Sequence, residues 1–233
     1  MIASRRETWA LIAVKRFDLA KTRLSPALAP AARTALAEAM LEEVLAALSG
    51  SSALDGALVV TSDPAAAAIA RRVGAAAIGD AAESGVNAAV DQGLRCLARW
   101  EASRAIVVPA DVPLLVGAEI DEVAAALDRA EVVLAPAERD GGTNVLALSP
   151  IDAIAPAFGA DSLNRHVEAA RAAGREARIV RLSGAGLDID TPEDLERLVR
   201  RGGSTRAAAL LSELSARAPR RRAGSLPERI MQQ

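Results

Sequence analysis

The 233-residue sequence contains few of the residue types that many catalytic and binding sites require. Cys96 is the only cysteine and His166 the only histidine, which excludes an internal disulfide and any mechanism that needs two histidines. There is no tyrosine, and four other aromatic residues are too few for a surface that stacks single-stranded nucleic acid. No apolar run approaches the about 18 residues of a membrane span, and no apolar stretch of a signal peptide follows the first basic residues. These absences predict a cytoplasmic protein with no membrane partner.

The charge balance also bears on the choice of partner. The formal net charge is -2, which argues against nucleic acid as the main ligand. Hydrophobic residues make up 51% of the chain and charged residues 25%, as in ordinary globular proteins. A chain of this length can bury one substantial core without disulfides or structural metals.

Lysine is nearly absent, although basic residues are not. Of the 28 basic residues only Lys15 and Lys21 are lysines, and both lie in one N-terminal segment. This placement favours a need for a compact ammonium group there, with chance as the alternative. Together with Arg16 and Arg23 they follow a predicted strand, where fixed cations suit a polyphosphate. A solvated basic loop is the other interpretation.

Short apolar runs typical of buried strands alternate with longer helical patterns. The runs cover residues 9–14, 57–61, 75–78, 105–108, 132–135, 145–148 and 178–182, and the helical patterns cover residues 30–48, 64–73, 87–101, 117–128, 161–173 and 192–201. This alternation predicts an α/β fold with a doubly wound, mostly parallel sheet and helices on both faces. Ligands of such folds bind at the carboxyl ends of the strands. Neither a Walker pattern nor a G-x-G-x-x-G after a strand is present, which argues against a P-loop enzyme and a dinucleotide dehydrogenase.

Residues 1–202 are predicted to form a single domain, since no earlier boundary is visible. Gly202-Gly203-Ser204 interrupts the pattern, and a short helix over about 205–216 is expected to follow. In the C-terminal part, 203–233, the last residues carry five arginines and one glutamate from position 217 onward. A disordered, solvated tail is favoured for them over a segment that docks a partner.

Three aspartates follow predicted strands. Asp111 lies in Pro109-Ala110-Asp111-Val112-Pro113, and Asp188 and Asp190 lie two residues apart in Leu187-Asp188-Ile189-Asp190-Thr191-Pro192. Carboxylates at such positions commonly hold Mg²⁺, which bridges phosphates. Taken alone, Asp190 or Thr191 is more simply the N-cap of the next helix. Together with the basic loop, the three aspartates predict a site for a metal ion and a triphosphate.

Two further segments have the composition of ligand loops. Asp140-Gly141-Gly142-Thr143-Asn144 permits close approach of backbone N–H groups to an anion, but it is equally typical of a hairpin turn. Phe158 to His166 contains Gly159 and Ser162 at a predicted helix start, which favours a phosphate or carboxylate there. His166 falls one helical turn beyond Ser162, where it is either a substrate contact or a structural residue.

Five motifs in this order resemble those of one enzyme family. They are Val14-Lys15 with Ala20-Lys21-Thr22-Arg23-Leu24, Pro109-Ala110-Asp111-Val112-Pro113, Gly142-Thr143-Asn144, Phe158-Gly159-x-x-Ser162 and Leu187-Asp188-Ile189-Asp190-Thr191-Pro192. Over about residues 9–200 the chain resembles the 2-phospho-L-lactate guanylyltransferase family of coenzyme F420 biosynthesis, whose bacterial members use phosphoenolpyruvate or 3-phospho-D-glycerate.

The resemblance implies a Rossmann-like fold of the nucleotide-diphospho-sugar transferase type. It also implies a Mg²⁺-dependent reaction in which the phosphate of a three-carbon acid attacks GTP and releases pyrophosphate. The implied residues are Asp111, Asp188 and Asp190 for the metal, Thr143, Gly159 and Ser162 for the acid, Lys15, Lys21 and Arg23 for the triphosphate, and Gly85, Asn87 and Pro109 for the nucleotide. A downstream transferase that receives the product is compatible with this reaction. Exposed apolar surface on the alanine-rich helices would permit a homodimer, and the sequence leaves the oligomeric state open.

Three other functions compete with this interpretation. A molybdenum-cofactor guanylyl- or cytidylyltransferase usually has a glycine-rich loop after the first strand, and none is present here. A nucleotide-sugar glycosyltransferase normally has its Asp-x-Asp motif in the middle of the chain, whereas Asp188-Ile189-Asp190 comes late. A non-catalytic nucleotide-binding regulator would release no pyrophosphate.

Overall fold

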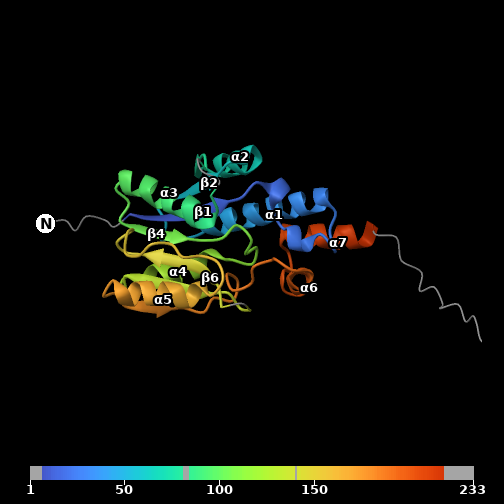
Figure 1. Ribbon diagram of the computed structural model, residues 1–233. Coiled ribbons are helices and arrows are strands. Elements are labelled where there is room, and N and C mark those ends of the chain that lie inside the picture. The colour runs from blue at the N-terminus through green and yellow to red at the C-terminus, as the bar shows by residue number, and fades with distance from the viewer. Residues whose placement is uncertain (1–6, 81–83, 140, 218–233) are drawn as a thin grey trace, which may run out of the picture.

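The predicted α/β sheet is present in the computed structural model, which describes residues 7–80, 84–139 and 141–217 (Figure 1). Its seven strands lie in the order β3-β2-β1-β4-β6-β5-β7. They are β1 (Thr8–Val14), β2 (Gly56–Thr61), β3 (Ala76–Ile78), β4 (Arg104–Val107), β5 (Val132–Pro136), β6 (Thr143–Leu148) and β7 (Ala177–Ile179). The pairings are parallel except that β6 runs antiparallel to both β4 and β5. The predicted strands are confirmed, with β7 shorter than expected.

The helices begin where the sequence carries start signals. They are α1 (Pro30–Ser49), α2 (Pro64–Arg72), α3 (Val86–Arg99), α4 (Gly117–Ala126), α5 (Ser162–Ala172), α6 (Pro192–Arg201) and α7 (Arg206–Arg217), with two 3-10 turns, η1 (Phe17–Leu19) and η2 (Thr22–Leu24). Proline occupies the first turn of α1, α2 and α6, where a missing N–H costs nothing. The Asp63 side chain caps α2 by accepting hydrogen bonds from Ala65 N and Ala66 N.

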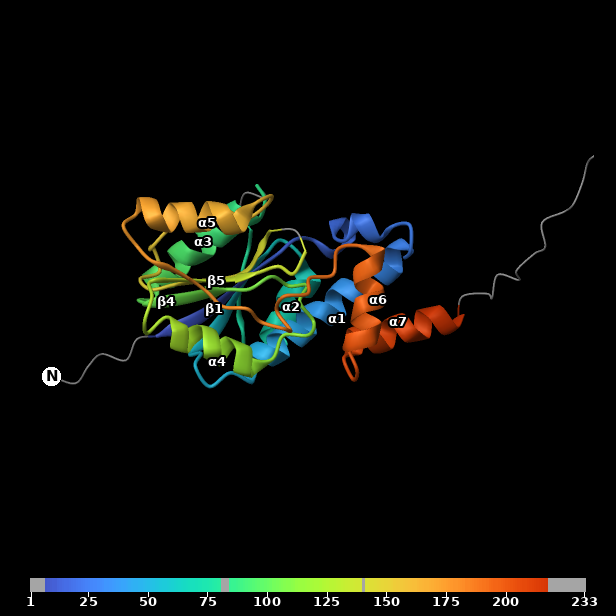
Figure 2. The same cartoon turned by 90° about the horizontal axis from the view of Figure 1, so that it is seen from below.

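Helices cover both faces of the sheet, as predicted. Helices α1, α2 and α4 pack on one face with Ala10 and Ile12 of β1, and α3 and α5 pack on the other with Leu11 (Figure 2). This explains why the strands are apolar on both sides rather than alternating. Gly93 allows α3 to approach β1 closely, since a Cβ there would lie 2.9 Å from Leu11 Cδ2.

Helices α6 and α7 lie at one end of the sheet, beside α1, in both views (Figures 1 and 2). Met40 of α1, Ile189, Leu198 of α6 and Leu211 of α7 belong to one apolar cluster there. The helix expected after Gly203 is therefore packed against the preceding domain. The tail predicted from residue 218 onward lies outside the described residues. None of the helices in the described ranges is long and apolar enough to cross a membrane.

The direction of β6 brings a fourth strand end to the edge where β1, β2 and β4 end. Leu146 of β6 pairs with Val107 of β4, so Thr143 at the start of β6 lies beyond the carboxyl end of β4. Residues 137–142 connect β5 to β6 as a hairpin loop, which is one of the two alternatives for this segment. Asp140 lies outside the described residues. The loops after β1 and β4 and the start of β6 thus face one another.

Candidate active site

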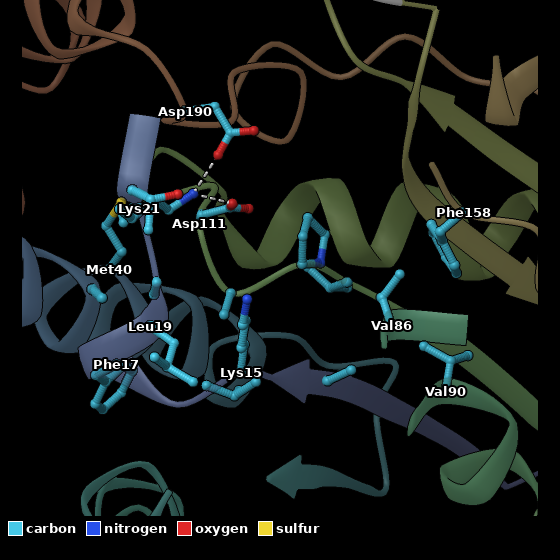
Figure 3. A pocket seen from close by; sticks show the side chains of 18 of the residues that line it. Lys15, Phe17, Leu19, Lys21, Met40, Val86, Val90, Asp111, Phe158 and Asp190 are labelled. Atoms are coloured by element: carbon cyan, nitrogen blue, oxygen red, sulfur yellow. Dashed lines mark hydrogen bonds and ion pairs between the residues drawn. The ribbon is translucent and has the colours of Figure 1, made fainter. Parts of the chain in front are cut away.

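A cavity of about 360 Å³ opens at this edge of the sheet (Figure 3). Five of its polar side chains come from four separate parts of the chain: Lys15 and Lys21 follow β1, Asp111 follows β4, Thr143 begins β6, and Asp190 precedes α6. Apolar side chains complete the lining, among them Val86, Val90 and Phe158 on the side of α3. The cavity therefore combines a charged end with an apolar wall.

The charged end is organised around Lys21. Its ammonium group donates a hydrogen bond to the Asp111 carboxylate and another to Asp190 Oδ1 at 2.8 Å (Figure 3). Lys21 has a φ of 54°, a left-handed conformation that is unfavourable for a residue with a Cβ. Burial alone would lower the pKa of Lys21, but the charges of Asp111 and Asp190 raise it above its ordinary value. Lys21 is therefore a fixed cation at the carboxyl ends of the parallel strands.

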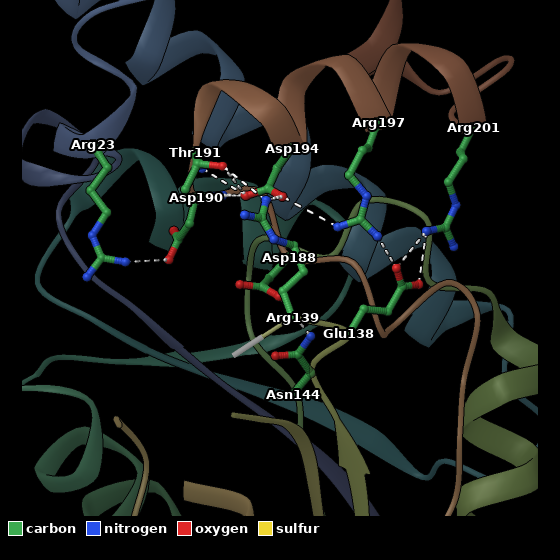
Figure 4. A network of polar contacts seen from close by, with 10 residues as sticks. All are labelled: Arg23, Glu138, Arg139, Asn144, Asp188, Asp190, Thr191, Asp194, Arg197 and Arg201. Atoms are coloured by element: carbon green, nitrogen blue, oxygen red, sulfur yellow. Dashed lines mark hydrogen bonds and ion pairs between the residues drawn. The ribbon is translucent and has the colours of Figure 1, made fainter. Parts of the chain in front are cut away.

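Asp190 is free to bind Lys21 because its neighbours form the helix cap. Thr191 is the N-cap of α6, and the buried Asp194 carboxylate accepts hydrogen bonds from Thr191 N and Thr191 Oγ1, both at 2.9 Å (Figure 4). Asp194 also accepts from the backbone N–H of Asp190 at 3.2 Å. Of the two predicted caps, Thr191 is the one observed. Arg23 lies 3.6 Å from the other oxygen of Asp190.

Asp188 is held next to this group by a different residue. Asn144 of β6 donates from Nδ2 to Asp188 Oδ1 at 3.2 Å and to Ala185 O at 2.8 Å (Figure 4). The Ile189 N–H donates to Asp111 O at 3.1 Å, which ties the two aspartate segments together. Burial raises the pKa of Asp188, and the nearby charges of Asp111 and Asp190 raise it further. Asp111 and Asp190 are thus close enough to affect the ionisation of Asp188.

These aspartates are not gathered as a ready-made metal site. Among the described residues, no group of three or more histidine, cysteine, aspartate or glutamate side chains is placed to hold an ion. Lys21 instead lies between Asp111 and Asp190. Binding of a metal ion by all three carboxylates therefore requires them to rearrange.

Thr143 brings a hydroxyl group to the cavity lining, and Ser162 lies buried behind it. The backbone N–H of Thr143 donates to Ser162 Oγ at 2.8 Å, and Thr143 Oγ1 lies 3.0 Å from Nδ1 of the buried His166. Ser162 is the first residue of α5, and His166 follows one turn later, as the spacing predicted. The start of α5 is thereby fixed to the start of β6.

The segment before α5 is fixed by Asn87. Its side chain accepts a hydrogen bond from Phe158 N at 2.7 Å and donates to Phe158 O at 3.1 Å. Gly159 follows with a φ of 117°, a conformation that glycine adopts readily. Asn87 thus holds the loop that carries Phe158 and Gly159, and both of its polar atoms are engaged in doing so.

A second cavity, of about 410 Å³, continues from the first. Both are lined by Val14, Lys15 and Val86, and the second adds Ser62, Asp80 and Gly85. Lys15 therefore lies where the two cavities meet. Together they form one elongated cleft across the ends of β1 and β2.

The predicted residues fall into three groups in or beside this cleft. Lys21, Arg23, Asp111 and Asp190 meet at the charged end, with Asp188 next to them. Thr143 lines the cavity and is bonded to Ser162, which is bonded in turn to Gly159, and neither of these two is a lining residue. The third group, Lys15, Gly85 and Pro109, lines the cavities. Asn87 is not among the lining residues but positions Phe158, which is. Sequence reasoning gave no role to Asp80 or Asp194, and it named Asn144 only within the Gly142-Thr143-Asn144 motif. Asp80 lies two residues beyond the end of β3 and Asn144 is the second residue of β6, and these positions at the ligand-binding edge were the available signal.

An open α/β sheet with a cleft at its strand ends, a fixed cation and clustered carboxylates is the arrangement expected of a nucleotidyltransferase. A family model described as "Guanylyl transferase CofC like" matches residues 8–233. The phosphoenolpyruvate guanylyltransferase of Conexibacter woesei is 38% identical over 214 residues, covering 89% of this chain and 96% of the relative. The chain belongs to the CofC-like guanylyltransferase family.

The names of other relatives specify different acid substrates. The 2-phospho-L-lactate guanylyltransferase of Methanothermobacter thermautotrophicus is 36% identical over 208 residues, with 89% of this chain and 91% of the relative covered. The 3-phospho-D-glycerate guanylyltransferase of Phenylobacterium zucineum is 38% identical over 214 residues, with 89% and 97% covered. The identities are similar, so they do not discriminate between the acids.

Solved structures confirm the predicted fold. A Desulfovibrio desulfuricans protein assigned to the nucleotide-diphospho-sugar transferases superimposes with a TM-score of 0.73 at 17% identity, covering 90% of this chain and 95% of that one. The CMP:2-keto-3-deoxy-manno-octonic acid synthetase solved with CTP gives a TM-score of 0.59 at 13% identity, with 89% and 99% covered. At these identities the likeness concerns the fold alone.

Proposed function

We propose that the protein transfers GMP from GTP to the phosphate of a small phosphorylated three-carbon acid, with release of pyrophosphate, as a step of coenzyme F420 biosynthesis in the cytoplasm. One observation carries this proposal: a single cavity is lined both by Lys21 with its two aspartates and by Thr143, whose backbone is bound to Ser162. The first group suits a triphosphate and the second a smaller anion. Family membership favours this reaction over the molybdenum-cofactor and glycosyltransferase alternatives.

We assign the nucleoside to the second cavity. Lys15 lies where the two cavities meet, so it is placed to neutralise a triphosphate that extends from this cavity toward Lys21. Among the described residues, Asp80 contributes a carboxylate to the lining of the second cavity, and a carboxylate can accept from the paired N–H donors of guanine, which adenine lacks. Gly85 and Pro109 then border the bound nucleotide, in keeping with the sequence prediction.

The donor set at the charged end fits Mg²⁺. Carboxylate oxygens are the protein ligands that this ion prefers, and Asp111, Asp188 and Asp190 carry more negative charge than Lys21 alone compensates. These three residues would hold the ion, with Lys21 released from one or both carboxylates toward the triphosphate. When bound, the ion would neutralise charge on the reacting phosphates.

The chain's own residues then have the task of alignment. An oxygen of the acid's phosphate is already an anion, so it can attack the α-phosphorus directly. A new phosphorus–oxygen bond forms as the bond to the β-phosphate breaks, and pyrophosphate leaves with that bridging oxygen. Lys15, Lys21 and Arg23 offset charge on the triphosphate, while Thr143 and Ser162 orient the acid.

The test is pyrophosphate release by the purified protein with GTP and Mg²⁺. Phosphoenolpyruvate, 3-phospho-D-glycerate and 2-phospho-L-lactate are offered separately, with a downstream deazaflavin-accepting transferase present to capture an unstable product. We expect release with one acid and GTP, and none with ATP or CTP. If no pyrophosphate is released with any of the three acids while GTP still binds, the proposed class of acceptor is refuted and the assignment of a nucleotide-binding site is retained.

A further inference from the structure

His166 is a buried group to which the steps above give no role. Its side chain is fully buried, with Nδ1 3.0 Å from Thr143 Oγ1. On the opposite side of the ring, Nε2 accepts a hydrogen bond from the backbone N–H of Ala157 at 2.9 Å. The Phe158 ring packs against the imidazole edge-on, with centroids 5.1 Å apart. The ring is therefore held from several sides beneath the wall of the cavity.

These contacts determine where the proton of the ring lies. A backbone N–H can only donate, so Nε2 must be the acceptor. Burial, together with the charge of Arg165, lowers the pKa of His166 to about 4, which leaves the ring neutral at pH 7. A neutral imidazole carries one proton, and here it must be on Nδ1. Nδ1–H consequently donates to Thr143 Oγ1.

A hydroxyl that accepts in this way still has its own proton to donate. Thr143 lines the cavity, whereas His166 lies behind it and is not exposed. Ser162, which is not a lining residue, also has an acceptor site occupied, since its Oγ accepts the Thr143 N–H. Both hydroxyls therefore have an acceptor site engaged by a protein donor, and each has a proton available for an anion.

We propose that His166 is a positioning residue for the acid: by donating from Nδ1 to Thr143 Oγ1, it directs the Thr143 hydroxyl proton toward the oxygens of the bound phosphorylated acid. This inference rests on the proposed function, because it requires the acid to bind at Thr143. His166 itself does not touch the acid.

Two substitutions separate the roles of the two ring nitrogens. His166→Asn places an amide donor near the position of Nδ1, while His166→Gln places an acceptor near the position of Nε2 and lacks the donor to Thr143. We expect His166→Gln to raise KM for the acid about 10-fold and His166→Asn to raise it less than about 3-fold. KM for GTP should stay unchanged in both variants, which a general loss of structure would not permit.

A double-mutant cycle with Thr143→Val tests whether His166 acts through that hydroxyl. In the Thr143→Val background, His166→Gln should have no further effect on KM for the acid. Thr143→Ser keeps the hydroxyl and serves as the matched control, in which the His166→Gln effect should persist. An equal loss in the Asn and Gln variants, or a full His166→Gln effect in the Thr143→Val background, would overturn the proposal.

The wild-type protein provides an independent measurement that does not depend on variants. Because the chain has one histidine, ring-¹⁵N labelling of protein without a histidine tag gives the signals of His166 alone. We expect a protonated Nδ1 and an unprotonated Nε2 at pH 7. The opposite tautomer or an imidazolium would overturn the inference. Failure of the proposed function would instead appear as absent pyrophosphate release with this tautomer intact.

Discussion

Lys21 and Asp111 form an ion pair across 90 residues of sequence, and Asp190 joins it from the other end of the chain. The pair connects the loop after β1 to the loop after β4, the two central parallel strands of the sheet. An ammonium group on two carboxylates holds the charged end of the cleft together in the free protein. If a metal ion takes over these carboxylates, the same ammonium group would be released to bind a phosphate.

Replacement of Lys21 should therefore affect turnover more than replacement of its exposed neighbour. We expect Lys21→Met to lower kcat by at least about 100-fold, since a fixed cation at the reacting phosphates is lost. Arg23→Met is the matched control, because the Arg23 side chain is 75% exposed and lies 3.6 Å from Asp190. Its effect should be within about 10-fold. Steady-state rates of pyrophosphate release measure both, and equal losses would contradict a special role for Lys21.

Asp188→Asn should separate activity from stability. The pKa of Asp188 is raised by burial and by the charges of Asp111 and Asp190, so its ionised form is disfavoured in the free protein. The amide removes that charge while keeping the shape, so the free energy of unfolding should be unchanged or higher. Turnover should fall by at least about 100-fold because a proposed Mg²⁺ ligand is weakened.

Magnesium titrations and urea denaturation of the same samples test this prediction. Wild-type activity should vanish on chelation with EDTA and return with added Mg²⁺. Asp111→Asn is the companion variant, which loses the ion pair with Lys21 as well as a proposed ligand. Near-normal activity of both aspartate variants would rule out the metal assignment.

Most of the fold follows from local sequence patterns, whereas the contacts within the site do not. Strands such as β1 are apolar because both faces are covered, and helices such as α6 begin at Thr191-Pro192, so both leave a local signal. The apolar run of β6 reads the same in either direction, and the short connection from Pro136 to Thr143 decides its orientation. The pairing of Lys21 with Asp190 and of Thr143 with His166 depends on the assembled fold, and no spacing reveals it.

Asp194 should contribute stability that depends on pH. Burial alone would raise its pKa, but the hydrogen bonds from Thr191 and Asp190 hold the pKa of Asp194 below its ordinary value. We expect Asp194→Asn to lower the free energy of unfolding at pH 7 by about 1–3 kcal/mol. Because the folded-state pKa is depressed, this contribution is present above about pH 4 and is lost as the pH falls through the folded-state value.

Urea denaturation at pH 7 and at successively lower pH checks this expectation. Glu196→Gln, an exposed substitution on the same helix, is the control and should change stability little at either pH. The difference between wild type and Asp194→Asn should narrow as the pH falls below about 4. A difference that does not change with pH would show that the carboxylate charge is not what stabilises the cap.

Gly184 marks the point where the segment leading to Asp188 and Asp190 passes closest to its neighbours. A Cβ there would lie 2.6 Å from Glu119 Oε2 and 2.7 Å from the Leu114 carbonyl carbon. The buried Glu119 carboxylate accepts the Gly184 N–H at 2.7 Å and the Ala185 N–H at 3.2 Å, so the segment cannot move away without losing these bonds. Gly184→Ala should therefore both destabilise the fold and displace the aspartates.

We expect Gly184→Ala to lower the free energy of unfolding by about 2 kcal/mol or more and to reduce turnover in protein that remains folded. Gly79→Ala is the matched control, since a Cβ at that position meets nothing within 4 Å. Denaturation curves give the stability, and pyrophosphate release at a temperature below both transitions gives the activity. If Gly184→Ala were as stable and active as Gly79→Ala, the close approach of this segment to Glu119 would have no part in placing Asp188 and Asp190.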